Sequence, residues 1–111
     1  MKTSIILSTY NGEKYIVEQL DSLRQQTRPA DEVLIRDDCS SDNTVQTVKD
    51  YIARYQLNNW SIQKNTQNQG WKKNFSNLLT DASGDVIFPC DQDDIWHLDK
   101  VKVELTDEDC R

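Results

Sequence analysis

Two acidic clusters in the sequence place carboxylates next to one another. Three carboxylates lie within residues 91–94, directly after a short apolar run, and Asp37 and Asp38 directly follow another. Packed carboxylates repel one another, and a divalent cation relieves that repulsion. Oxygen ligands favour Mg²⁺, Mn²⁺ or Ca²⁺ over zinc, and Mg²⁺ commonly uses one or two carboxylates plus substrate phosphates. The short Asp-x-Asp formed by Asp91 and Asp93 therefore predicts a site for a divalent metal and a phosphorylated ligand.

Each cluster also has a purely structural interpretation. Ser40, Ser41 or Asp42 could cap a following helix by accepting hydrogen bonds from its unpaired backbone N–H groups. A turn needs one Asp rather than three, however, and Trp96 beside the second cluster is costly to expose. Loop chemistry therefore explains residues 91–94 less well than it explains the first cluster.

The segments around the clusters alternate between strand and helix patterns. Short apolar runs predict four strands, and the third of them alternates in polarity as an edge strand does. The expected strands are Ser4–Ser8, Glu32–Arg36, Trp60–Lys64 and Asp85–Pro89. Helical spacing predicts four helices: one from Lys14 with Ile16, Leu20 and Leu23; one with Val45, Val48, Ile52 and Tyr55; one with Trp71, Phe75, Leu78 and Leu79; and one from near His97 with Leu98, Val101 and Leu105 inward.

This order of elements predicts an α/β fold with a mostly parallel sheet of about four strands flanked by helices. Ligands of such sheets bind outside the carboxyl ends of the strands. The polar residues after the first, second and fourth strands are therefore expected on one rim. With 111 residues, the chain is expected to form a single domain, 1–111.

Composition narrows the classes of partner and location. The net charge of −6 argues against binding to nucleic acid. No apolar stretch approaches the roughly 20 residues of a membrane span, so a cytoplasmic protein is expected. Three cysteines without a Cys-x-x-Cys pair argue against a disulfide framework or a structural zinc site.

Four stretches in order resemble the N-terminal, nucleotide-binding half of a family 2 glycosyltransferase with the GT-A fold. They read SIILSTYNGEKYIVEQLDSLRQQT, DEVLIRDDCSSDNT, NQGWKKNFSNLLTDASGD and VIFPCDQDDIWHLDK, and they span nearly all of residues 3–100. The form CDQDDIW is similar to bacterial enzymes described as rhamnosyltransferases.

The resemblance implies a role for individual residues. Asp38 would accept the N3–H of a uracil or thymine base with Asp37 beside it, Asp91 would face the ribose or donor sugar, and Lys72 or Lys73 would approach the diphosphate. The implied nucleotide-binding set is Thr9, Tyr10, Asn11, Asp37, Asp38, Lys72 and Asp91. The implied ligands of a Mn²⁺ or Mg²⁺ cofactor are Asp91 and Asp93.

The implied reaction is metal-dependent, inverting transfer of a sugar from a UDP- or dTDP-sugar to a polysaccharide or lipid-linked acceptor. The general base of that reaction is expected beyond Arg111, in an acceptor-binding half that this chain lacks. The chain is therefore expected to be a truncated form of the fold that binds donor and has little transfer activity alone. In the full-length protein it is expected in the cytoplasm or peripherally at the inner face of the membrane.

Two alternatives come from other classes of protein. One is a receiver-like signalling domain with a Mg²⁺-binding acidic pocket, which would need an acid pair after the first strand, where this sequence has Ser-Thr-Tyr-Asn. The other is a non-catalytic association domain, because truncation would bare apolar surface and favour a homodimer.

Overall fold

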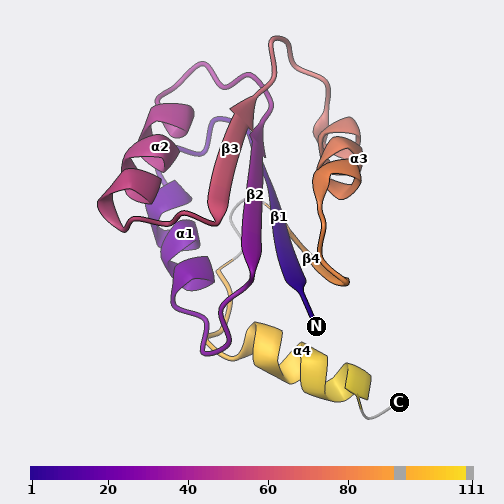
Figure 1. The fold of residues 1–111 in the computed structure, drawn as a ribbon. Coiled ribbons are helices and arrows are strands. Elements are labelled where there is room, and N and C mark those ends of the chain that lie inside the picture. Colours follow the sequence, from indigo (N-terminus) through magenta and orange to yellow (C-terminus); the bar gives the residue numbers. More distant parts are fainter. Residues whose placement is uncertain (92–94, 110–111) are drawn as a thin grey trace.

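The computed structural model describes residues 1–91 and 95–109 of the chain. Its strands and helices alternate along the sequence as predicted (Figure 1). The strands are β1 (Thr3–Thr9), β2 (Glu32–Asp37), β3 (Trp60–Lys64) and β4 (Val86–Cys90). The helices are α1 (Ile16–Arg24), α2 (Thr44–Arg54), α3 (Trp71–Asp81) and α4 (Lys100–Asp109).

The four strands form one sheet in the order β3-β2-β1-β4, and every pairing is parallel. The central position of β1 explains its composition, since all seven of its residues are buried. Ile6 of β1 is flanked by Leu34 of β2 and Pro89 of β4. The predicted parallel α/β sheet is therefore confirmed, and β3 lies at an edge as predicted.

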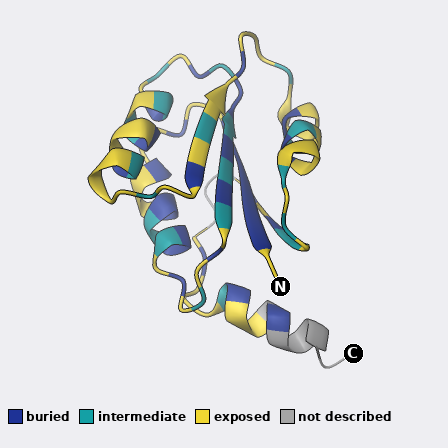
Figure 2. Cartoon of the chain, viewed as in Figure 1, coloured by how far each residue is buried: buried dark blue, intermediate teal, exposed yellow. Residues whose placement is uncertain are grey.

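Helices cover the two faces of the sheet unequally. Helices α1 and α2 lie against one face and α3 lies against the other (Figure 1). The main core forms on the α1 and α2 side, where Ile5, Leu7 and Val33 of the sheet pack with Leu20 and other buried side chains. Figure 2 shows this as buried residues along β1 and along the inward sides of α1 and α2.

Helix α3 departs from the predicted apolar pattern. Leu78 is buried as the helical spacing predicts, but Trp71 and Leu79 are 64% and 52% exposed. The most deeply buried side chain of this helix is instead polar, since Asn74 is 0% exposed. The prediction that Trp71, Phe75, Leu78 and Leu79 all face inward was therefore partly wrong. The face of α3 that carries Asn74 meets the polar ends of the strands.

Helix α4 begins later than predicted and runs further. Val101 and Leu105 point inward as predicted, but Leu98 is 53% exposed. Leu98 precedes the helix, and its backbone carbonyl accepts a hydrogen bond from the Thr27 N–H at 2.8 Å. Within the described residues, no helix is long and apolar enough to cross a bilayer.

The strand order places a topological switch at β1. The chain passes from β1 to β2 and β3 on one side of the sheet and then returns to β4 on the other. In open parallel sheets, ligands bind outside the carboxyl ends of the strands at such a switch point. The fold therefore indicates a ligand site at the carboxyl ends of β1 and β4.

Candidate functional site

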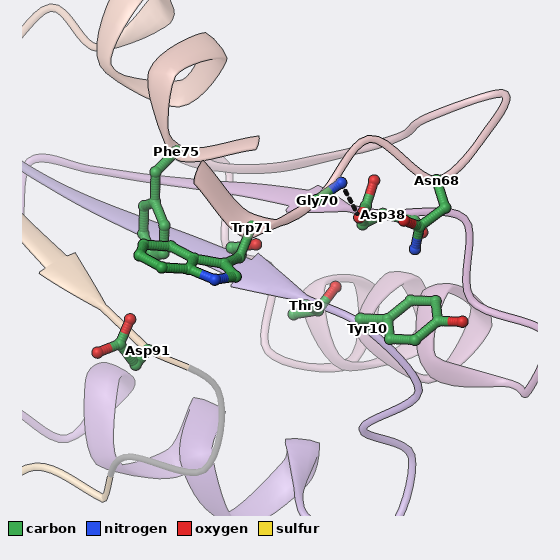
Figure 3. Close-up of a pocket in the computed structure, with 9 residues that line it drawn as sticks. Thr9, Tyr10, Asp38, Asn68, Gly70, Trp71, Phe75 and Asp91 are labelled. Carbon is green, nitrogen blue, oxygen red and sulfur yellow. Dashed lines mark hydrogen bonds between the residues drawn. The ribbon is translucent and has the colours of Figure 1, made fainter. Parts of the chain in front are cut away.

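A pocket of about 410 Å³ lies at the carboxyl ends of the central strands, next to the start of α3 (Figure 3). Its wall combines segments far apart in the sequence. The lining residues are Ser8, Thr9, Tyr10, Asp38, Asn68, Gly70, Trp71, Phe75 and Asp91. Four residues predicted to contact a nucleotide thus line one pocket: Thr9, Tyr10, Asp38 and Asp91.

Asp38 is held in this wall by hydrogen bonds from the loop that precedes α3. Its Oδ1 accepts from the backbone N–H of Gln69 at 2.7 Å and from Asn65 Nδ2 at 3.0 Å. Its Oδ2 accepts from the backbone N–H of Gly70 at 2.9 Å. An ionised carboxylate offers about four acceptor positions. Three of them are therefore used, and acceptor capacity remains on Oδ2.

These bonds also determine the charge of Asp38, which is only 4% exposed. Burial raises the pKa of its carboxyl, but the hydrogen bonds from Gln69, Asn65 and Gly70 outweigh burial and hold that pKa below its ordinary value. Asp38 therefore presents a fixed, ionised acceptor to the pocket at neutral pH.

Asp37, the other member of the pair, lies away from the pocket wall. It is 0% exposed, and its Oδ1 accepts from the hydroxyls of Thr9 at 2.8 Å and Ser40 at 2.6 Å. Its Oδ2 accepts from the backbone N–H of Ser40 at 2.7 Å. Asp37 is the last residue of β2 and Asp38 follows the strand, and the two carboxylates have different hydrogen-bond donors. Asp37 ties the ends of β1 and β2 together behind the pocket.

Asn11 also serves the loops rather than the pocket wall. It has a left-handed backbone (φ 48°), and its Oδ1 accepts from the backbone N–H of Ser41 at 2.8 Å. None of the predicted residues is the N-cap of α2, which is Asn43 and makes no side-chain cap hydrogen bond. Asp42 lies one residue before that cap, and its Oδ1 accepts from the Thr44 N–H at 3.0 Å. Asn11 and Asp42 thus fasten the loops that follow β1 and β2.

Asp91 is the described residue that fits the predicted metal site. It is exposed at the end of β4, and its backbone carbonyl is fixed by a 2.5 Å hydrogen bond from Gln19 Nε2. A hard, exposed carboxylate oxygen suits Mg²⁺ or Mn²⁺. Among residues 1–91 and 95–109, no three His, Cys, Asp or Glu side chains gather as a metal-binding group. The predicted second ligand, Asp93, lies outside the described residues.

A second cavity of about 380 Å³ adjoins the pocket and shares Trp71, Phe75 and Asp91 with it. It runs between α3 and β4 and is mostly apolar. The residues lining this α3–β4 groove are Ile6, Trp71, Lys72, Phe75, Ser76, Leu79, Pro89 and Asp91. Lys72 therefore lies in the groove beside the pocket, with its ammonium 5.6 Å from the centre of the Trp71 ring.

Sequence reasoning missed several residues of the pocket wall, namely Ser8, Asn68, Gly70, Trp71 and Phe75. Gly70 carried a usable signal, because a glycine directly before a helical pattern often marks a backbone with positive φ. Its φ is indeed 90°, and its N–H donates to Asp38 (Figure 3). Trp71 and Phe75 matched the pattern of a helix core, so their place at the pocket was not recognised.

The family model described as "Glycosyl transferase family 2" matches residues 4–106. The chain is 38% identical over 104 residues to the poly(ribitol-phosphate) beta-N-acetylglucosaminyltransferase TarS of Staphylococcus aureus, covering 92% of the chain and 18% of TarS. It is 36% identical over 99 residues to the dTDP-rhamnosyl transferase RfbG of Shigella flexneri, covering 86% of the chain and 34% of RfbG. The chain thus spans only a part of each of these relatives.

Solved structures agree with the sequence comparison. The crystal structure of TarS residues 1–349 in complex with UDP matches 98% of the chain, and the chain covers 32% of it, with a TM-score of 0.85 and 37% identity. A mannosyltransferase from Pyrobaculum calidifontis in complex with GDP-Man and Mn²⁺ matches 90% of the chain, which covers 30% of it, with a TM-score of 0.84 and 26% identity. The fold is therefore that of the GT-A glycosyltransferases, of which the chain holds a part.

Proposed function

The chain belongs to glycosyl transferase family 2, and we propose that it is the donor-binding part of an enzyme that transfers a sugar from UDP- or dTDP-sugar. The observation that carries the proposal is the fixed, ionised carboxylate of Asp38 at the wall of a pocket at the strand ends. The comparison with TarS, solved with UDP, supports a uracil nucleotide, and RfbG, named for dTDP-rhamnosyl transfer, supports a thymine nucleotide.

Asp38 would read the base by accepting the N3–H that uracil and thymine share. A buried acceptor is selective, because a base without that N–H leaves the carboxylate without its partner and with its desolvation cost. Aromatic side chains of the pocket, Tyr10, Trp71 and Phe75, offer flat surfaces for the base and ribose. In this proposal, Asp38 determines which base is bound, and the aromatic residues contribute much of the binding energy.

The diphosphate end of the donor would lie toward Asp91. A divalent metal held there by Asp91 and, as predicted, Asp93 would supply neutralisation of the leaving nucleoside diphosphate. Asp91 contributes a carboxylate at the pocket edge, and Gln19 fixes the backbone at this position through the 2.5 Å bond to its carbonyl. Lys72, which lines the α3–β4 groove together with Asp91, would add positive charge near the phosphates.

The acceptor in the complete enzyme would be a polysaccharide or a lipid-linked glycan, whose hydroxyl attacks the sugar with inversion. This transfer needs a general base to remove the proton of the hydroxyl. We assign no residue of this chain to that role, and the general base stays a prediction.

Isothermal titration calorimetry with UDP, dTDP and CDP, with and without Mn²⁺, tests the proposal. We expect UDP and dTDP to bind with Mn²⁺, and CDP, which lacks the N3–H, to bind at least about tenfold more weakly. Asp38→Asn should weaken UDP binding by about tenfold or more. Asp50→Asn, on the exposed side of α2, removes the same charge away from the pocket and should leave it unchanged.

Two results would overturn the proposal. One is that neither UDP nor dTDP binds at about millimolar concentration. The binding free energy would then be less favourable than about 4 kcal/mol. The other is equal affinity for UDP and CDP in the unaltered chain.

A further inference from the structure

Asn74, on α3, is a fully buried polar residue whose contacts reach three strand ends. Its Nδ2 donates to Ser8 Oγ at 2.7 Å and to the backbone carbonyl of Arg36 at 2.7 Å. Its Oδ1 accepts from Asn65 Nδ2 at 2.9 Å. The side chain is 0% exposed, and both ends of its amide are bonded.

Asn65 connects Asn74 with Asp38. Its Nδ2 donates to Asp38 Oδ1 at 3.0 Å as well as to Asn74 Oδ1, and its Oδ1 accepts from Arg36 Nε at 2.8 Å. Arg36 determines the orientation of both amides, because its Nε only donates and its backbone carbonyl only accepts. The three side chains therefore form one relay, with a single consistent arrangement of donors and acceptors.

We infer that Asn74 is a positioning residue for base recognition, which it supports through Asn65 and Asp38. This inference rests on the proposed function, in which Asp38 accepts the N3–H of the base. Without the Asn74 side chain, Asn65 keeps its hydrogen bond from Arg36 but loses one of the two acceptors of its Nδ2. The Asn65 donor to Asp38 Oδ1 is then held less firmly.

The expected consequence is a loss of discrimination rather than of binding alone. Hydrogen bonds weaken steeply as their angle departs from linearity. A carboxylate that keeps only its backbone donors from Gln69 and Gly70 can tilt on the side that faces Asn65 and then accepts the N3–H with poorer geometry, while the aromatic and phosphate contacts of the nucleotide remain. A role confined to folding would lower the affinity for every nucleotide in the same proportion.

The test compares UDP with the analogue CDP, because N3 of cytosine carries no hydrogen. Both are titrated with Mn²⁺ into the unaltered chain, Asn74→Ala and Thr80→Ala. Thr80 is an exposed residue of the same helix and serves as the matched control. We expect UDP to bind at least about tenfold more tightly than the analogue to the unaltered chain and to Thr80→Ala. In Asn74→Ala, that ratio should fall below about threefold, while affinity for the analogue changes less than about twofold.

The outcomes separate the two proposals. A ratio near one in the unaltered chain would refute base reading by Asp38, and with it the proposed function. A large ratio that survives in Asn74→Ala, or a fall of both affinities in proportion, would refute only the positioning role. If circular dichroism shows that Asn74→Ala does not fold, Asn65→Ala interrupts the same relay outside the helix. The ratio of its affinities for UDP and the analogue is then judged by the same criteria.

Discussion

At the scale of single residues, the site depends on how neighbouring carboxylates are separated into different roles. Asp37 and Asp38 are adjacent and both buried, yet one closes the strand ends with Thr9 and Ser40 while the other faces the pocket. The difference comes from their donors, because the N–H groups of Gln69 and Gly70 reach only Asp38. Because the same donors stabilise the ionised form of Asp38, its contribution to stability decreases as pH falls.

We predict a pH-dependent contribution of Asp38 to stability. Its folded-state pKa is lowered, so the ionised group stabilises the fold above its unfolded pKa of about 3.9, and this contribution is lost as pH falls through the folded pKa. Asp38→Asn should therefore lower the free energy of unfolding by about 1–3 kcal/mol at pH 7 and by less near pH 3. Urea denaturation of both proteins at pH 7, 5 and 3 measures the difference.

The control for this experiment is Asp50→Asn, which alters an exposed carboxylate of α2. Its effect should stay within about 0.5 kcal/mol at neutral pH. A difference between the unaltered chain and Asp38→Asn that stays constant from pH 7 to pH 3 would contradict the assigned role.

At the scale of elements, α1 holds the flanks of the second acidic cluster. Gln19 and Gln26 lie seven residues apart, so they share one face of the helix or its immediate extension. Gln19 bonds the carbonyl of Asp91, and Gln26 bonds the carbonyl of His97 at 2.6 Å and the N–H of Val101 at 3.1 Å. Both glutamines are nearly fully buried. The helix thus sets where the chain leaves β4 and where it enters α4.

We predict that Gln26→Ala loosens α4 more than it loosens the rest of the fold. The substitution leaves the buried N–H of Val101 without its acceptor, which costs about 1–3 kcal/mol, whereas the His97 carbonyl keeps its hydrogen bond from the Lys100 N–H. Hydrogen exchange at the amide of Val101 should accelerate. Exchange of the β1 amides should change only as much as the global free energy of unfolding changes. Gln46→Ala, at an exposed position of α2, is the matched control and should change neither. Equal acceleration in α4 and β1 would show that Gln26 acts on the whole fold instead.

At the scale of the whole molecule, the two sides of the sheet are covered to different extents. The α1 and α2 side holds the main core, whereas the α3–β4 groove leaves Trp71 and Leu79 more than half exposed. Exposed apolar surface of this kind favours association. The predicted homodimer, and the division of the chain into one domain of residues 1–111, stay predictions.

We predict concentration-dependent self-association through the α3–β4 groove. A charge in the groove must lose its hydration on association, so Leu79→Glu should raise the dimer dissociation constant by about tenfold, equivalent to 1.4 kcal/mol. Leu98→Glu alters an equally exposed leucine outside the groove and should have little effect. Sedimentation equilibrium across a concentration series measures the constant. A monomer at all concentrations, or equal effects of both substitutions, would count against this interface.

Local pattern alone determined the order of elements in this chain, the parallel sheet and the edge position of β3. Apolar periodicity depends on residues only a few positions apart, and parallel strands follow from their alternation with helices. The resemblance to known glycosyltransferases then distinguished Asp38 from Asp37, which spacing by itself could not do. The choice of Asp91 and Asp93 as metal ligands was also made from the sequence, and the structure bears on Asp91 alone.

Only the tertiary structure decided how Asp38 is held and which residues support it. Asn65, Gly70 and Asn74 are 27, 32 and 36 positions from Asp38, and none belongs to a pattern that sequence reasoning ties to a carboxylate. Buried amides such as Asn74 defeat helical periodicity, because a polar residue on a helix is expected to face water. Their burial is stable only where separate segments supply every hydrogen-bond partner, and that condition is met when the sheet brings the strand ends together.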